Sequence, residues 1–420
     1  MSRRFGLAMM TLAGLAACAG QPPPPAPEPA PDTVAATPTG PPPPRPRQLP
    51  VPAPLRHLTP VRLALVGDIN LGTSTLPGGL PPDTGRRLLA RAAPWLTGDL
   101  VIGNFEGVLA DTGTSEKCRE PSGDPPRPRQ ARGRRHVASE KAARAPGCFA
   151  FRTPTALAPR LVDAGFTHLN LANNHANDYG PAGRESTERI LDSLGIRTYG
   201  PLGQIAIDTI RRGDRLTIVG LIGFATYPHS YDLLDATRSE AVVDSIRPLV
   251  DLLVVTFHGG AEGVRALHVP ETAESLAQEP RGELRRWTHA VVDAGADVVV
   301  GHGPHVLRGI EYYRGKPVIY SLGNFVTYRG FNLEGPLGVT GVLQLEFAAD
   351  RRLQRARLVA MTQHPGHGPA PDPARSALDE VRRLSAEDFG PAAARISDDG
   401  EISAPAPSLP PPAHPPTDSR

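Results

Sequence analysis

One stretch of the chain, residues 167–195, decides the fold, and it reads THLNLANNHANDYGPAGRESTERILDSLG. Its first seven residues are a short apolar run of the kind that forms a buried strand. Residues 180–195 have apolar side chains at helical spacing and end in a glycine, which predicts a helix. At the end of this run and directly after it stand Asn173, Asn174 and His175, whose side chains suit neither a core strand nor a helix interior. The stretch therefore predicts a strand, a polar loop and a helix in one unit.

The same unit recurs along the chain. Six further short apolar runs predict buried strands, over residues 62–68, 99–104, 216–224, 251–259, 296–303 and 316–324. Two more amphipathic stretches, residues 153–165 and 281–295, predict helices. Strands that alternate with helices predict an α/β fold with a largely parallel sheet. In such a fold, functional sites gather beyond the carboxyl ends of the strands.

Proline marks the limits of the folded region. The chain has 420 residues and 49 prolines, and sixteen of these prolines fall within residues 21–54. Such tracts bury too little apolar surface to offset the loss of backbone entropy. We therefore expect a Pro-rich linker over 18–57, a folded domain over 58–350, a C-terminal extension with a helix over 351–390 and a disordered tail over 391–420. The folded region has no stripe of basic and aromatic residues, which predicts no nucleic-acid partner.

The N-terminus carries the features of an export signal. Residues 1–17 hold two arginines and a short apolar segment that is too short to span a bilayer as a helix. Small residues directly before Cys18 resemble a bacterial lipobox, so we expect Cys18 to be lipidated. The protein would then be an exported, membrane-anchored lipoprotein of the periplasm, outer membrane or cell surface. The alternative is an ordinary signal peptide with an incidental cysteine.

Two further cysteines, Cys118 and Cys148, bracket an insertion that is rich in proline and arginine. In an oxidising compartment two cysteines most simply pair, and closing this loop would contribute about 3 kcal/mol. The insertion holds eight Lys or Arg residues against three acidic ones. It is therefore either a solvated surface loop or a basic segment that attracts a polyanion electrostatically.

Polar side chains follow nearly every predicted strand at its carboxyl end. They are Asp, Glu, Asn and His, often beside a glycine that lets the backbone turn tightly. In chain order they are Asp68, Asn70, Asn104, Glu106, Asn173, Asn174, His175, His258, Glu262, His302, His305 and Asn324. Carboxylates, amide oxygens and imidazoles are ligands of divalent ions such as Mn, Fe or Zn. The set predicts a site for one or two such ions at one edge of the sheet.

The order of these motifs resembles the CapA family of poly-γ-glutamate capsule proteins, which is similar to the calcineurin-like metallophosphoesterases. The likeness runs from about residue 62 to residue 347, and its strongest parts are ANNHANDYG at 172–180 and GHGPHVLRGIEYYRGKPVIYSLGNF at 301–325. The resemblance implies a four-layer α/β/β/α sandwich with a dinuclear metal site where the strands end.

The resemblance also implies roles for individual residues. The metal ligands would be Asp68, Glu106, Asn174, His258, His302 and His305. His175 would lie just outside the metal ions as the catalytic proton donor, and Asn70, Asn104, Asn173, Glu262 and Asn324 would contact the ligands or the substrate. From the residues alone, we expect Asn173 to hold its turn by backbone hydrogen bonds and Asn177 with Asp178 to cap the next helix.

The chain departs from this pattern at three places. Asn70 stands where ordinary metallophosphoesterases have a histidine, and Asn104 replaces a bridging aspartate, with Glu106 two residues on. Such a site favours one weakly held metal or a different metal. The aromatic residue that commonly follows the His258 motif is also missing from HGGAEG.

Two classes of function remain open from the sequence. The first is a metal-dependent hydrolase or transferase acting on an amide or phosphoester bond, with an anionic polymer such as poly-γ-glutamate as substrate. The second is a non-catalytic lipoprotein that binds and guides an exported polyanion. A metallophosphoesterase is an alternative that rests on the fold alone. The expected partners are the membrane, through Cys18, and a membrane-bound polymer synthase.

Overall fold

A computed structural model describes residues 58–115, 117 and 149–406, all within one compact unit. The expected signal peptide, Cys18, the linker and the Cys118–Cys148 pair lie outside the described residues. No helix of the described part is long and apolar enough to cross a membrane.

The first sheet has eight strands and is built around β1 (Val61–Asn70). On one side of β1 the sheet continues in parallel through β2 (Leu100–Phe105), β5 (His168–Asn170) and β6 (Arg197–Tyr199). On the other side it continues through the antiparallel strands β17 (Val339–Phe347), β18 (Leu353–Thr362) and β19 (Ala370–Pro371). The eighth strand, β16 (Asn324–Thr327), pairs in parallel with the end of β1.

The second sheet has seven strands. Its centre is parallel and consists of β8 (Arg215–Ala225), β10 (Leu252–His258), β13 (Val298–His302) and β15 (Lys316–Ile319). Antiparallel strands close both edges, namely β7 (Ala206–Arg212) and β14 (Ile310–Tyr313), while β9 (Tyr231–Asp232) pairs with the end of β8. The seven predicted strand segments thus all contain strands, and they are shared between two sheets.

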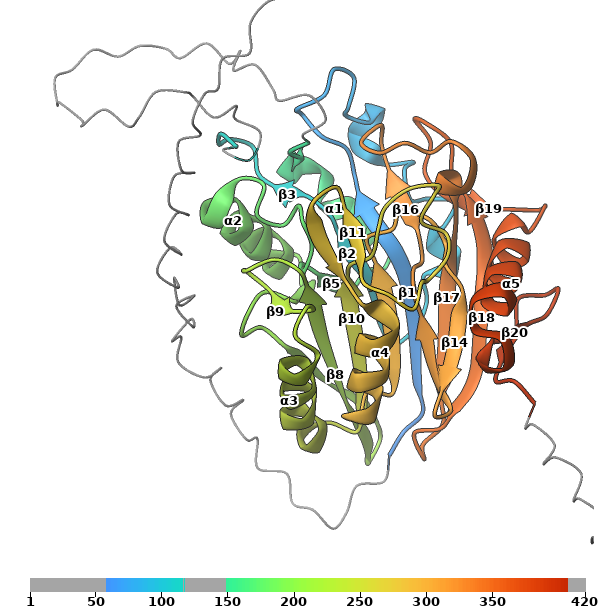
Figure 1. Cartoon of the computed structure of the whole chain (residues 1–420). Helices are drawn as coiled ribbons and strands as arrows, with labels where there is room; N and C mark the ends of the chain where they lie inside the picture. The colour runs from blue at the N-terminus through green and yellow to red at the C-terminus, as the bar shows by residue number, and fades with distance from the viewer. Residues whose placement is uncertain (1–57, 116, 118–148, 407–420) are drawn as a thin grey trace, which may run out of the picture. The chain divides into compact units, whose positions relative to one another are not determined.

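The two sheets pack face to face, and helices cover their outer faces (Figure 1). Side chains such as Leu65 and Leu345 of the first sheet meet Val254 and Val300 of the second in one buried cluster. The outer face of the first sheet packs with α1 (Pro159–Asp163) and α2 (Gly180–Ser193). The outer face of the second sheet packs with α3 (Ala236–Ile246) and α4 (Leu284–Asp293). This arrangement confirms the predicted α/β/β/α sandwich.

Short elements complete the unit. The two-stranded pairs are β3–β4 (Val108–Leu109 with Arg152–Thr153), β11–β12 (Glu274–Leu276 with Glu279–Gly282) and β20–β21 (Arg395–Ile396 with Ile402–Ser403). The 3₁₀ helices are η1 (Pro82–Gly85), η2 (Ala93–Trp95), η3 (Thr155–Leu157), η4 (Arg247–Leu249), η5 (Gly335–Gly338) and η6 (Gly390–Ala392).

The predicted C-terminal boundaries need correction. The boundary at residue 350 falls in the turn between β17 and β18, and these strands pair over their whole length. The helix α5 (Ser376–Phe389) contributes Leu378 and Val381 to the core between the sheets. The expected disorder from residue 391 is wrong as far as residue 406. There the backbone pairs with β14 and β18, and Ile402 is buried, so enough apolar surface is buried to order the chain despite its prolines.

Asn324 also needs correction, because it begins a strand and does not end one. The predicted strand 316–324 is two segments: β15 ends at Ile319 in the second sheet, and Asn324 starts β16 in the first. The chain crosses between the sheets there. The crossing depends on Gly67, since a Cβ atom at that position would lie 1.8 Å from the carbonyl oxygen of Gly323. Glycine alone permits so close an approach of two backbones.

Candidate metal centre

The two sheets bring the carboxyl ends of their central strands to one place. Asp68 and Asn104 are register partners near the ends of β1 and β2 in the first sheet. His258 and His302 are register partners at the ends of β10 and β13 in the second sheet. The amide nitrogen Nδ2 of Asn104 lies 3.4 Å from Nδ1 of His258, so the side chains of the two sheets meet directly.

Asp68 is fully buried at the centre of this group. Its Oδ1 accepts a hydrogen bond of 2.8 Å from Nδ2 of Asn104, and its Oδ2 lies 2.9 Å from Nδ1 of His305. Nδ1 of His302 is 3.5 Å from Oδ1. Burial alone would raise the pKa of Asp68, but the two histidines lower it far below its ordinary value, so Asp68 is a carboxylate.

Glu106 is the feature that most clearly calls for a ligand. It is fully buried, and neither carboxylate oxygen has a hydrogen-bond partner. Its ligand atom lies within 4.8 Å of those of Asp68 and His258, and together these three residues could hold a metal ion. Burial is the main cause that raises the pKa of Glu106 well above its ordinary value. Nε2 of His258 and Nε2 of His305 approach Oε1 to 3.9 and 3.8 Å without making hydrogen bonds. A buried carboxylate without hydrogen bonds is costly unless a cation or a proton neutralises it.

Other unpartnered atoms at the site fit the same explanation. Ten buried side-chain N or O atoms of the described residues lack a hydrogen-bond partner, and five of them belong to predicted site residues. These five are both oxygens of Glu106, Oδ1 of Asn174, Nδ1 of His302 and Oδ1 of Asn324. Buried polar atoms normally have partners, so this concentration is informative. The donors are oxygens and imidazole nitrogens, which suit a divalent ion.

His305 lies between the acidic groups. Its Nε2 is 3.8 Å from Glu106 Oε1 and 3.8 Å from Glu262 Oε2, while its Nδ1 faces Asp68. Burial alone would lower the pKa of His305, but these three carboxylates raise it to about 10. Its backbone φ of 61° lies in the left-handed region, which strains a residue other than glycine. The surrounding structure must therefore hold the backbone of His305 in this conformation.

His175 is oriented by a residue that the sequence prediction placed elsewhere. Nδ1 of His175 lies 2.7 Å from Oδ2 of Asp178, and Nζ of Lys117 lies 2.6 Å from the other oxygen. A carboxylate can only accept a hydrogen bond, so Nδ1 of the neutral ring carries the proton and Nε2 is the unprotonated nitrogen. Burial lowers the pKa of His175, and Asp178 partly offsets this effect.

The predicted helix cap by Asn177 and Asp178 is therefore wrong. Helix α2 begins after Tyr179 without a side-chain cap. Asp178 turns inward to His175 and also accepts a 2.7 Å hydrogen bond from the backbone nitrogen of Phe151.

The asparagines divide into two groups. The side-chain amides of Asn70, Asn104 and Asn173 form hydrogen bonds within the protein. Nδ2 of Asn70 donates to the backbone oxygen of Glu106, and Oδ1 of Asn104 accepts from Nδ2 of Asn173. Oδ1 of Asn173 accepts from the backbone nitrogens of residues 175 and 176 and so holds the turn. In contrast, Oδ1 atoms of Asn174 and Asn324 are without partners.

Two groups at the site were not predicted from the sequence to belong to it. Arg281 is fully buried, and its Nη2 lies 2.8 Å from Glu262 Oε1 and 3.5 Å from His258 Nε2. No pattern in the sequence marks Arg281, because it arrives from the β11–β12 pair. The other group, Asp178, could have been found from its position three residues after His175, which allows a direct contact.

Aromatic side chains supply the wall that HGGAEG lacks. The ring of Phe331 lies 4.8 Å from the ring of His305, and that of Phe151 lies 4.4 Å from the ring of His175. The two phenylalanines touch edge to face at 5.2 Å. Both histidine rings therefore pack against an aromatic side chain.

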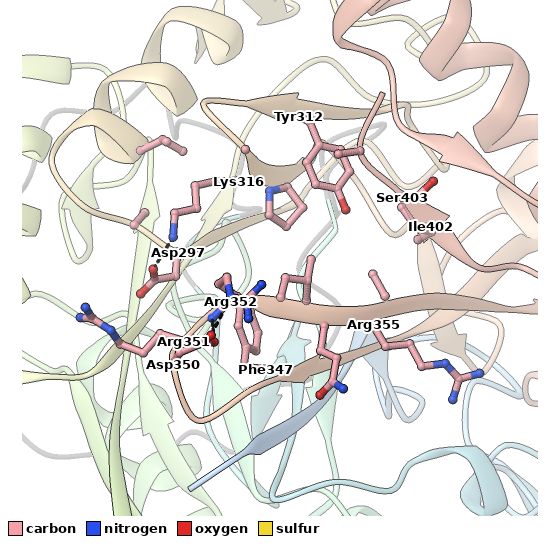
Figure 2. Close-up of a pocket in the computed structure, with 18 of the residues that line it drawn as sticks. Asp297, Tyr312, Lys316, Phe347, Asp350, Arg351, Arg352, Arg355, Ile402 and Ser403 are labelled. Atoms are coloured by element: carbon pink, nitrogen blue, oxygen red, sulfur yellow. Dashed lines mark hydrogen bonds and ion pairs between the residues drawn. The ribbon is translucent and has the colours of Figure 1, made fainter. Parts of the chain in front are cut away.

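A cavity of about 670 Å³ lies away from these residues, at the other end of the strands (Figure 2). Five basic and two acidic residues line it. Figure 2 shows Lys316 directed at Asp297 and Arg352 held by Asp350, whereas Arg351 and Arg355 extend away from the cavity. No residue of the candidate metal centre lines it.

The layered sandwich, with acidic, amide and histidine side chains at its strand ends, defines a metallophosphatase-like fold. Comparison with known proteins confirms the narrower resemblance to the CapA family. The family model described as "Bacterial capsule synthesis protein PGA_cap" matches residues 136–329. The chain is 33% identical over 188 residues to the PGA biosynthesis protein CapA of Bacillus subtilis (strain 168). It is 34% identical over 189 residues to the capsule biosynthesis protein CapA of Bacillus anthracis.

These likenesses cover only part of each protein. Both relatives match over 41% of this chain, which covers 45% of the Bacillus subtilis protein and 42% of the Bacillus anthracis protein. The chain therefore spans less than half the length of either relative. Among solved structures, it is similar to a 5′-nucleotidase precursor from Thermus thermophilus with a TM-score of 0.35 and 16% identity, over 78% of this chain and 59% of that one.

Proposed function

We propose that this protein is a metal-dependent hydrolase or transferase of the cell envelope, which acts on an anionic extracellular polymer such as poly-γ-glutamate. The observation that carries the proposal is the buried, unpartnered carboxylate of Glu106 beside Asp68 and His258. The names of the two relatives support a role in capsule biosynthesis. An exported lipoprotein with a long Pro-rich tether would act near the membrane, beside a polymer synthase.

The residues of the site would divide the work between them. Asp68, Glu106 and His258 would hold the divalent ion, with His302, His305, Asn174 and Asn324 as further ligands. When bound, such an ion lowers the pKa of water and stabilises negative charge on a carbonyl or phosphoryl oxygen.

His175 would transfer the proton. Its Nε2 is the nitrogen left free by Asp178, and the low pKa that burial gives the ring keeps it able to accept a proton near neutral pH. Asp178 would hold the ring in the required tautomer and stabilise it once it is protonated. Phe151 and Phe331 would exclude bulk water from the proton that moves.

The experiment is a cleavage assay with the purified full-length protein. Poly-γ-glutamate is incubated with the protein and Mn²⁺ or Zn²⁺, and chain length is followed by size-exclusion chromatography. A phosphate diester is tested in parallel. We expect shortening of the polymer by the wild type, a loss of about 100-fold or more in His175→Gln, and wild-type rates in Arg352→Gln. A polymer that stays intact while the diester is cleaved would replace this function with that of a phosphoesterase.

A non-catalytic polymer binder is the second candidate. The observation in its favour is the cavity of Figure 2, with five basic residues against two acidic ones. A binder would retain the polymer in Asp68→Asn and lose it in Arg352→Gln with Lys316→Gln. The reverse pattern supports the enzyme.

A further inference from the structure

Three carboxylates and one guanidinium face the candidate metal centre. Asp68 and Glu106 are fully buried, and Glu262 is largely buried with its Oε2 3.8 Å from His305. Arg281 lies among them and is fully buried. Burial is the main influence on the pKa of both Glu106 and His258, and the charge of Arg281 acts on both groups.

Arg281 is held firmly in this place. Its Nε donates to the backbone oxygen of Gly260 at 2.9 Å, and its Nη1 donates to the hydroxyl of Tyr227 at 2.6 Å. Its Nη2 donates to Glu262 at 2.8 Å. A guanidinium keeps its proton under all ordinary conditions, so it is a permanent positive charge in a site with little water.

We infer that the site binds one divalent ion and that Arg281 supplies the positive charge that a second ion would bring. The inference rests on the metal dependence proposed above. Histidines that ligate an ion are neutral, so the three carboxylates and one guanidinium leave a charge of −2, which one divalent ion neutralises. A second ion would leave a net charge of +2 in a buried site, which is unfavourable.

The amide side chains support the same stoichiometry. Asn70 and Asn104 stand where the metallophosphoesterase pattern has a histidine and an aspartate. Asn70 is turned to the backbone of Glu106 and Gly72, and Oδ1 of Asn104 is occupied by two other asparagines. At both positions the side-chain oxygen already accepts hydrogen bonds and is not available as a ligand for a second ion. They contribute by fixing Asp68 and the segment that carries Glu106.

The test is the number of ions bound and their affinity. The full-length protein is stripped with a chelator and titrated calorimetrically with Mn²⁺, and its metal content is measured after dialysis. We expect one equivalent in the wild type. Two equivalents, or none with either Mn²⁺ or Zn²⁺, would overturn the inference.

Two variants test the role of Arg281. Arg281→Met removes a positive charge beside the ion, so the affinity for Mn²⁺ should rise at least about tenfold. Unchanged or weaker binding by a folded variant would refute the role of its charge. Since this variant could misfold, Glu262→Gln serves as the second test, and its affinity should fall by about tenfold at one equivalent. Arg91→Gln, at an exposed position, is the control for a charge change and should bind as the wild type does.

The proposed function can fail independently of this inference. One equivalent of metal without polymer cleavage would retain the inference and refute the function. Two equivalents with cleavage would do the opposite.

Discussion

Replacing Glu106 with glutamine should stabilise the metal-free protein and destabilise the metal-loaded one. The reason is that the carboxylate is fully buried and neither of its oxygens has a hydrogen-bond partner. Glutamine has nearly the same shape and carries no charge. The substitution therefore removes the cost of burying a charge, and it also removes a ligand of the ion.

The size of the effect follows from two opposing interactions. An unpartnered buried polar group costs about 1–3 kcal/mol, and a charged one costs more. Attraction between a charged His305 and the Glu106 carboxylate, 3.8 Å apart, would stabilise the carboxylate by up to about 4 kcal/mol at an effective dielectric constant near 20. The pKa of Glu106 is nevertheless raised, so burial outweighs the attraction. We expect a gain of about 1 kcal/mol without metal, because the glutamine amide is still buried.

With metal bound, the wild type should be more stable than Glu106→Gln. An ion present at about 100 times its Kd stabilises the wild type by about 2.7 kcal/mol, and the variant should gain almost none of this. The assay is urea denaturation followed by circular dichroism at mildly alkaline pH, once with EDTA and once with Mn²⁺. Glu334→Gln, at an exposed position, is the control and should stay within about 0.5 kcal/mol of the wild type. A variant that is less stable in EDTA and responds equally to Mn²⁺ would show that Glu106 is a structural residue.

Three further predictions concern other parts of the molecule. Asp178→Asn should lower kcat for the polymer about 100-fold and leave KM nearly unchanged, because it disturbs the tautomer of His175 and not the binding of substrate; an equal rise in KM would contradict this. Burial raises the pKa of Asp208, but the hydrogen bond and charge of His168 outweigh burial and lower this pKa below its ordinary value of 3.8. The Asp208 carboxylate therefore stabilises the fold above pH 3.8, and this contribution is lost as the pH falls below 3.8. Asp208→Asn should accordingly lower the urea midpoint at neutral pH and have little effect at strongly acidic pH, and a pH-independent loss would argue against the pair. Gly67→Ala should destabilise the protein by more than about 3 kcal/mol in urea denaturation, because its methyl group would meet a backbone oxygen at 1.8 Å, and a stable variant would mean that β1 and β16 can separate.

The layers of the fold were predictable because they depend on local patterns. Residues 167–195 contain β5, the polar loop and α2 in the predicted order. The division of the strands between two sheets came from the family resemblance, since apolar runs do not state which strands they pair with. The crossing at Asn324 was missed because the predicted strand was extended through SLGN, although serine, glycine and asparagine are typical of a turn. The strand pairings reveal it, because β15 pairs in the second sheet and β16 pairs in the first.

The site was predictable where its residues end strands and was not where they arrive from elsewhere. The sequence predicted that Asp68, Glu106 and His258 lie together, because each is near the end of a strand or directly after it. Asp178 was assigned to a helix cap, which is the most frequent use of an aspartate before a helix. Its real contacts are to His175 and Phe151, and they depend on the tertiary fold.

The origin of the ligands links the metal centre to the assembly of the sandwich. Asp68 and Glu106 come from the first sheet, and His258 comes from the second. These three residues therefore come together only when the two sheets are packed, and an ion held by them would bind tightly only in the assembled sandwich. The interface between them is apolar and non-directional, and it does not by itself fix how the sheets are aligned. The contact of Asp68 with His305 and the approach of Asn104 to His258 cross from the first sheet to the second, and they provide that directional information. Asp68, a buried charge of the candidate metal centre, is therefore also one of the groups that align the two sheets.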